Sequence, residues 1–149
     1  MASEYKSKHG IVSKSPYELF MAFSDMSNFK RMLPPDKQDS VTADYDTLTA
    51  TYNGMSMGVK VYQRVPYSRI ELVDYGAPFG FYARFHFDPV SDRPGATDFY
   101  IELSADLNMV TKMFIGGKIQ GVLDKIVDGL ADASEGKMPE GFDPSQFGL

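Results

Sequence analysis

Residues 108–133, NMVTKMFIGGKIQGVLDKIVDGLADA, form the longest helical pattern in this chain of 149 residues and decide its fold. From Ile115 onward the apolar residues recur at helical spacing, and the charged residues lie off their stripe. The stripe consists of Ile115, Ile119, Val122, Leu123, Ile126 and Leu130. A single amphipathic helix that follows a run of strands needs a sheet to pack against, so the pattern predicts a long C-terminal helix lying on a sheet.

The first two turns of this stretch do not follow the same stripe. The phase changes at Gly116-Gly117, and adjacent glycines weaken a helix by up to ~1 kcal/mol each relative to alanine. We therefore predict a bend or local distortion at this pair. The apolar side chains before it would either meet loops and short helices at one end of the sheet or form a flexible gate beside a cavity. These side chains are Met109, Val110, Met113 and Phe114.

The chain before this helix alternates apolar and polar residues over seven short segments, which predicts seven strands. The segments span residues 4–12, 41–45, 47–52, 59–65, 69–75, 81–88 and 97–105. Short connections join most of them, so we expect a mostly antiparallel sheet with one apolar and one polar face. After the first strand, Ser15-Pro16 with Glu18 predicts a capped helix start, and a second short helix at 29–33 follows. The predicted order is β-αα-β6-α, in the α+β class.

The composition is that of a globular protein of about one domain, which we place at residues 1–134. Residues 135–149 are rich in Gly and Pro and predict a flexible C-terminal tail. The net charge of −5 argues against a nucleic-acid-binding surface, and the absence of cysteine excludes disulfides and thiolate metal sites. No apolar run approaches the ~20 residues of a membrane span, and the N-terminal segment lacks a signal-peptide core. We expect a cytoplasmic protein that is a monomer or a weak homodimer.

Several short motifs, in this order of elements, resemble the START-like or Bet v 1-like superfamily, also called SRPBCC or polyketide-cyclase-like proteins. The motifs are SKSPYELF at 13–20 with Asp25 and NFK at 28–30, RVPYSRI at 64–70, Thr97, and ADLN at 105–108. The resemblance covers residues 4–134 and implies a helix-grip fold. In that fold a curved seven-stranded antiparallel sheet wraps around a long C-terminal helix and leaves a cavity between them. Members of the superfamily share no catalytic residue set, so we assign no catalytic residue.

The apolar face of the predicted sheet offers candidate ligand-binding residues. Small-molecule sites are mostly apolar with a few placed polar groups, and those groups would be His9, Tyr52 and Gln63. The full set that we expect to contact a ligand is His9, Tyr52, Val61, Gln63, Phe81, Phe85, Phe99, Ile101, Met109, Met113 and Phe114. A filled core accounts for most of the apolar members without any ligand.

Two histidines are the candidates for acid–base chemistry. His9, in phase with Tyr5, could act as a general base, but no Asp or Glu has a strong claim to orient it. His86 lies in phase with Arg84 and opposite the phenylalanines, so we expect it to face solvent. Because the two histidines would lie on different faces, we expect no metal site and no cofactor. Arg84 and Glu102 are predicted to pair across neighbouring strands on the outer face.

Three functions remain open from the sequence. The first is the binding of a hydrophobic small molecule, lipid-, sterol- or polyketide-like, in a cavity between sheet and helix. The second is a cyclase- or aromatase-like enzyme that uses the same cavity and moves protons with His9 or a tyrosine. The third is a protein-interaction domain of the co-chaperone kind, which would need a sizeable exposed apolar patch. Whether any reaction is catalysed is left open.

Overall fold

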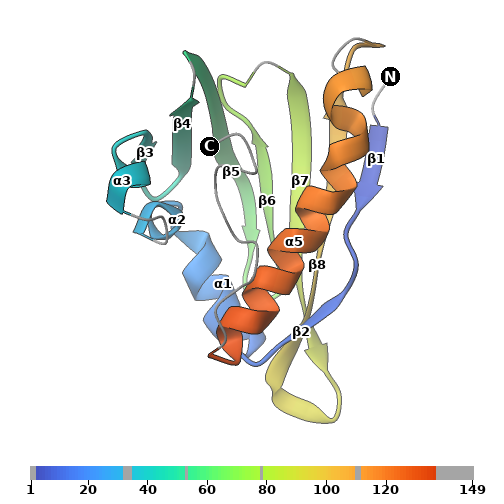
Figure 1. The fold of residues 1–149 in the computed structure, drawn as a ribbon. Coiled ribbons are helices and arrows are strands. Elements are labelled where there is room, and N and C mark those ends of the chain that lie inside the picture. The colour runs from blue at the N-terminus through green and yellow to red at the C-terminus, as the bar shows by residue number, and fades with distance from the viewer. Residues whose placement is uncertain (1–2, 32–34, 53, 78, 110–111, 137–149) are drawn as a thin grey trace.

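The computed structural model describes residues 3–31, 35–52, 54–77, 79–109 and 112–136. Two short strands and three short helices come first, then six strands, and a π-helical turn leads into a long helix (Figure 1). The elements are β1 Ser3–Lys6, β2 Gly10–Val12, α1 Pro16–Ser24, α2 Ser27–Arg31, α3 Pro35–Gln38, β3 Val41–Ala43, β4 Thr47–Tyr52, β5 Met55–Val65, β6 Arg69–Asp74, β7 Gly80–Val90, β8 Arg93–Asp106, η1 Lys112–Gly116 and α5 Gly117–Ser134.

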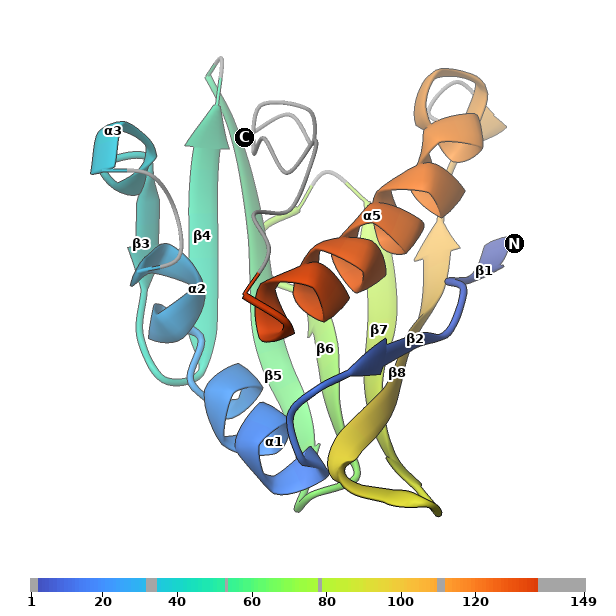
Figure 2. The same cartoon turned by 60° about the horizontal axis from the view of Figure 1, so that its bottom comes forward.

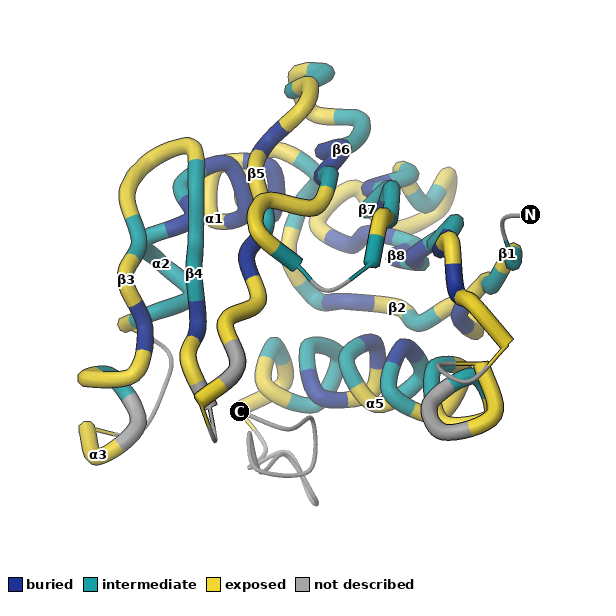
Figure 3. Tube along the Cα trace, turned by 90° about the horizontal axis from the view of Figure 1, so that it is seen from above, coloured by how far each residue is buried: buried dark blue, intermediate teal, exposed yellow. Residues whose placement is uncertain are grey.

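The strands form one antiparallel sheet in the order β1-β8-β7-β6-β5-β4-β3, and β2 also pairs with β8. The sheet curves, and α5 runs across its concave side (Figure 3). This is the predicted helix-grip arrangement in the α+β class, and its order of elements is confirmed apart from the additional short helix α3. The first predicted strand is divided into β1 and β2, which accounts for the eighth strand among the described residues.

The core lies on the concave face, at the end of the sheet where β2, α1 and the second half of α5 meet. Val12, Phe87, Phe99, Ile101 and Val127 are 0% exposed there. Each such side chain contributes about 1.5–3 kcal/mol by leaving water. The ring of a buried phenylalanine from α1 enters the same cluster; Phe23 lies 5.6 Å from Phe85, 5.6 Å from Phe87 and 5.8 Å from Phe99, centroid to centroid.

A β-bulge separates β1 from β2. Between the pairs Lys6–Glu102 and Gly10–Phe99, the three residues 7–9 face the two residues 100–101 of β8. One extra residue in a strand reverses the alternation of the side chains that follow it. The continuous 4–12 strand of the sequence interpretation is therefore wrong in phase after residue 7.

Ser7 forms hydrogen bonds with the backbone of Ile101 at this bulge. Its N–H donates to the carbonyl of Ile101 over 2.8 Å, and its hydroxyl oxygen accepts from the N–H of Ile101 over 2.8 Å. Ser7 is buried, as Tyr5 partly is, whereas His9 beyond the bulge is exposed. The predicted shared face of Tyr5 and His9 is thus corrected.

The helix α1 begins as the sequence predicts. Ser15 is its N-cap and accepts from the N–H of Glu18 over 3.2 Å, while the Glu18 carboxylate accepts from the N–H of Ser15 over 3.3 Å. Pro16 occupies the first helical position, where no hydrogen-bond donor is needed. This capping box sets the direction in which α1 crosses the end of the sheet.

α5 lies directly on the β1–β2 segment. Three hydrogen bonds join the two segments. Gln120 Nε2 donates to the carbonyl of Lys6 over 2.6 Å. The N–H of Lys8 donates to Asp124 Oδ1 over 2.7 Å, and the N–H of Ser13 donates to Ser134 Oγ over 2.9 Å. A Cβ on Gly10 would lie 2.5 Å from Val127 Cγ1, so only glycine permits this approach. Val127, which the sequence stripe omitted, is consequently the most deeply buried apolar residue of α5.

The entry to α5 is irregular. The π-helical turn η1 ends at Gly116, and α5 begins at the next residue, Gly117. The local distortion predicted at this glycine pair is therefore confirmed. π-helical segments are rare and occur mostly as such single turns. Of the predicted gate, residues 110–111 and the side chain of Phe114 lie outside the described part of the chain.

Candidate functional site

An apolar pocket of about 110 Å³ is lined by residues of α1, α2 and the C-terminal part of α5. Figure 2 shows these three helices on the same side of the sheet. Five of its six lining residues are apolar, and the sixth is an asparagine. The lining residues are Leu19, Ala22 and Phe23 from α1, Asn28 and Phe29 from α2, and Leu130 from α5. Because Ala22 is exposed while Leu19 and Phe23 are buried, the pocket runs from the surface to the edge of the core.

The junction of α1 and α2 is held by local hydrogen bonds. Asp25 accepts from the N–H of Ser27 over 3.0 Å and from its hydroxyl over 2.6 Å. These bonds keep the pKa of Asp25 below its usual value. Asn28 Nδ2 donates to the carbonyl of Ala22 over 2.9 Å, so a pocket-lining amide also closes the C-terminal turn of α1.

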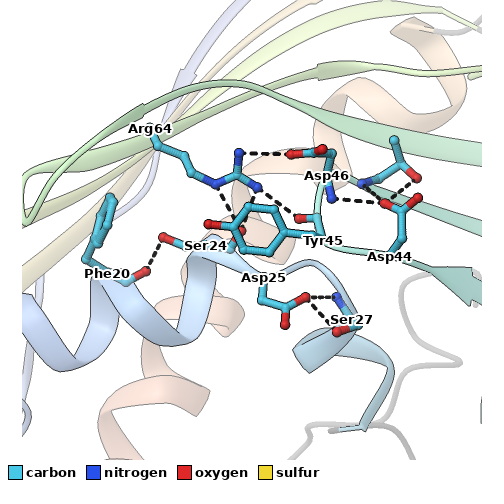
Figure 4. Close-up of polar contacts among 9 residues, drawn as sticks. Phe20, Ser24, Asp25, Ser27, Asp44, Tyr45, Asp46 and Arg64 are labelled. Carbon is cyan, nitrogen blue, oxygen red and sulfur yellow. Dashed lines mark hydrogen bonds and ion pairs between the residues drawn. The ribbon is translucent and has the colours of Figure 1, made fainter.

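Arg64 ties the same junction to the sheet (Figure 4). Its Nε and Nη2 donate to the carbonyl of Ser24 over 3.1 and 2.8 Å, and Nη2 also donates to the carbonyl of Tyr45 over 2.9 Å. Its Nη1 lies 3.0 Å from Asp46 Oδ1, and the guanidinium stands 4.0 Å from the centre of the Tyr45 ring. Arg64 thereby joins the end of α1 to the connection between β3 and β4.

The inward position of Arg64 was not predicted from the sequence, because a second β-bulge lies just before it in β5. The pairing of β5 with β6 shifts by one residue between Val61 and Gln63, which leaves Tyr62 unpaired among the register partners. Beyond the bulge Arg64 is only 22% exposed in its side chain, whereas Gln63 is exposed. The prediction that Gln63 shares the inner face with Val61 is therefore wrong.

Two cationic residues follow the pocket-lining Asn28 at the end of α2. Arg31 Nη1 donates to Asn28 Oδ1 over 2.6 Å, and Lys30 and Arg31 form the last turn of this helix. The amide of Asn28 is thus oriented by two bonds, accepting from Arg31 and donating to Ala22. A polar group bound at the mouth would meet this amide and the guanidinium.

The apolar residues predicted to contact a ligand fall into the core rather than the pocket. Val61, Phe99 and Ile101 are buried, and Phe81 and Phe85 are half-buried on the concave face. None of them is among the residues that line the described pocket. Their role in ligand binding stays a prediction.

His9 lies on the convex face of the sheet, contrary to the predicted inner position. Its ring stacks on Tyr100 with centroids 4.2 Å apart, and its Nδ1 lies 2.8 Å from Asp98 Oδ1. His86 stacks on the same tyrosine at 4.4 Å. The two histidines therefore share a face, which corrects the prediction of different faces. His86 lies opposite the phenylalanines, as predicted, but its side chain is only 17% exposed rather than open to solvent. Neither histidine borders the pocket.

The outer face carries a charge network around this stack. Glu102 Oε1 lies 2.6 Å from His86 Nε2 and 3.5 Å from Arg84 Nε, so the predicted Arg84–Glu102 pair is confirmed. Burial raises the pKa of Glu102, but the His86 hydrogen bond and the neighbouring cations outweigh it and leave that pKa below its usual value. Burial, followed by the nearby carboxylates, raises the pKa of Tyr100.

Four residues that the sequence predicted to contact a ligand remain. Two of them lie near the end of α5 that is far from the pocket, and the side chains of the other two are not described. Met109 and Met113 are each 80% exposed, near the start of α5, whereas the pocket adjoins Leu130 near its end. The predicted gate of methionines therefore does not stand at this pocket. The side chains of Tyr52 and Phe114 are not described.

The pocket residues carried a recognisable signal in the sequence. Leu19 and Phe23 lie on one side of the first predicted helix, and Phe29 falls in the second, so two short helices each offered an apolar face. What the sequence did not indicate is that these faces meet Leu130. Within the described residues there is no group of three or more metal-ligating side chains and no helix suited to crossing a membrane.

Comparison with solved structures places this fold among known ones. A norcoclaurine synthase from Thalictrum flavum matches with a TM-score of 0.67 and 10% identity, covering 91% of this chain and 96% of that chain. A protein from Thermobifida fusca matches at 0.64 and 13%, covering 88% and 92%, and the Aha1 dimer from Colwellia psychrerythraea at 0.56 and 13%, covering 87% and 96%. No family model and no curated protein matches the chain. The chain therefore shares the helix-grip fold of these solved structures.

Proposed function

We propose that the protein binds a small hydrophobic molecule, or the apolar part of a larger one, in the pocket between α1, α2 and α5. The observation that carries the proposal is an apolar recess at the surface with one oriented amide at its mouth. Small-molecule sites combine such an apolar lining with a few placed polar groups.

The size of the pocket limits what it can hold. Its volume of about 110 Å³ compares with an engineered apolar cavity of ~150 Å³ that binds benzene. Sites that enclose a drug-sized ligand measure ~300–1,000 Å³. A ring or a short stretch of alkyl chain therefore fits, and the rest of a larger ligand would extend from the mouth or along the concave face.

Partly exposed apolar side chains around the core support such an extension. Several of those that pack against the core keep part of their surface exposed, namely Leu48, Val59, Phe85, Leu103, Ile119 and Ile126. The fold supports the proposal as well, because a norcoclaurine synthase of the same fold is described in complex with a transition-state analogue. That likeness concerns the fold alone and assigns no chemistry to this chain.

A neutral hydrophobic dye such as Nile red tests the proposal. We expect the wild type to raise its fluorescence saturably, and Ala22→Trp, which places an indole in the pocket, to weaken binding at least about tenfold. Met21→Trp is the matched control, because Met21 is the adjacent exposed residue of α1 and does not line the pocket. Absence of saturable binding to the wild type, or equal loss in both variants, would reject the proposal.

A further inference from the structure

We infer that the ligand is an amphiphile with an anionic head group, of the monocarboxylate type, whose head is bound at Asn28 and Arg31. This inference rests on the proposed function, since it concerns the same pocket. It adds the chemical class of the ligand and the residue that selects it.

The first step is the position of Arg31. It lies one helical turn after Asn28, and its Nη1 donates to the Oδ1 of that pocket-lining amide over 2.6 Å. The guanidinium is thus held against Asn28, the polar residue of the pocket lining, while Phe29 and Leu130 are among its apolar lining residues. An apolar recess with a cation fixed at its rim is complementary to an alkyl chain that ends in an anion.

The second step is the charge around the mouth. Of the carboxylates on the neighbouring helices, Glu18 contacts Ser15 and Asp128 contacts Lys8. Asp25 accepts from Ser27 and also lies close enough to Arg31 for this cation to contribute to the lowering of its pKa. Arg64, the other cation near the junction, is turned to the carbonyls of Ser24 and Tyr45 and to Asp46. With two cations, Lys30 and Arg31, against the one carboxylate of Asp25, the end of α2 keeps a net positive charge, although the whole chain carries −5.

The third step is the chemistry of the guanidinium. Its planar donors match the two oxygens of a carboxylate, and it stays protonated at every physiological pH. The Nδ2 of Asn28 already donates to the carbonyl of Ala22, so this amide cannot by itself favour an anion. Selection between charged and neutral head groups falls to Arg31.

Decanoate and 1-decanol form the test, because they share one alkyl chain and differ in the head. Both are titrated below their aggregation limits by displacement of Nile red. At low salt we expect the wild type to bind decanoate about fivefold more tightly than 1-decanol, the ratio that an exposed charge pair supports. The preference should shrink at 0.5 M salt because the contact is screened.

Variants of Arg31 test whether this residue causes the preference for decanoate. We expect Arg31→Gln to abolish the preference and Arg31→Lys to keep part of it, while Arg93→Gln, at the distant exposed start of β8, leaves it unchanged. Equal binding of both probes by the wild type, or a preference that survives Arg31→Gln, would overturn the inference and leave the proposed function standing. Failure of both probes to displace the dye would instead reject the proposed function.

Discussion

The two helical units on the concave face rest on different halves of the sheet. α5 packs on β1, β2 and β8, whereas α1 contacts β6 and β7, and α2 contacts β3. Where α5 meets β2 the core is sealed, with Val127 against Gly10. Between α5 and the pair α1 and α2, the pocket remains. The pocket thus lies at the seam between two helical units, α1–α2 and α5, which pack on different strands. Because each unit is held by its own strands, the apolar space between them is not filled by side chains.

The largest expected effect comes from the sealed region. Phe99→Ala should lower the free energy of unfolding by about 3–5 kcal/mol, because it removes a fully buried ring and leaves a cavity. Phe29→Ala, at the seam and half-buried, should cost about 1–2 kcal/mol. Urea denaturation followed by circular dichroism measures both. Equal losses would contradict the distinction between the two regions.

A smaller effect is expected from the junction that Arg64 holds. Arg64→Met should cost about 1–3 kcal/mol, because the carbonyl of Ser24 loses both guanidinium bonds and that of Tyr45 keeps only the N–H of Met26. The same variant should raise amide hydrogen exchange in α1 and α2 more than in α5. Arg93→Met provides the control for loss of a guanidinium. Uniform exchange changes across all helices would argue against an anchor that is specific to one unit.

The close packing of α5 on β2 can be tested by a substitution at Gly10. Gly10→Ala should cost about 1–3 kcal/mol, because the new Cβ would lie 2.5 Å from Val127 Cγ1 and must displace it. Gly95→Ala in β8 is the matched control, since a Cβ there meets nothing within 4 Å. Thermal unfolding of the two variants should separate them clearly. If Gly10→Ala is as stable as Gly95→Ala, α5 does not need this close approach.

The smallest effect concerns the convex face and its dependence on pH. The folded-state pKa of Glu102 is lowered, so its contribution to stability is fully present above the unfolded value of ~4.3 and is lost as the pH falls through the lower folded value. Because the side chain is about one third exposed, Glu102→Gln should cost at most ~1 kcal/mol near neutral pH and nothing in strong acid. Asp92→Asn, in an exposed turn, controls for the removal of one negative charge. A difference that grows toward acid would have the wrong sign.

The sequence predicted what depends on local pattern. The capping box at Ser15, the alternating strands, the C-terminal helix and the distortion at Gly116 all follow from residues within one element. The fold could therefore be predicted before any coordinates, including the order of its elements.

The positions of individual side chains could not be predicted in the same way. Two bulges, at residues 7–9 and at Tyr62, each reverse the alternation without any marker in composition. His9 and Gln63 consequently turn outward, and Arg64 turns inward. The pocket depends on contacts between α2 and α5, which are about a hundred residues apart and leave no periodic signal.

The central claim, that the seam between α1–α2 and α5 holds a ligand, is tested most directly by methyl NMR of leucine-labelled protein. On titration with 1-decanol, the account predicts that the methyl signals of Leu19 and Leu130 shift most, while those of Leu72, buried on β6, shift little. Shifts centred on Leu48 and Leu103, or no saturable shift at Leu19 and Leu130, would contradict it.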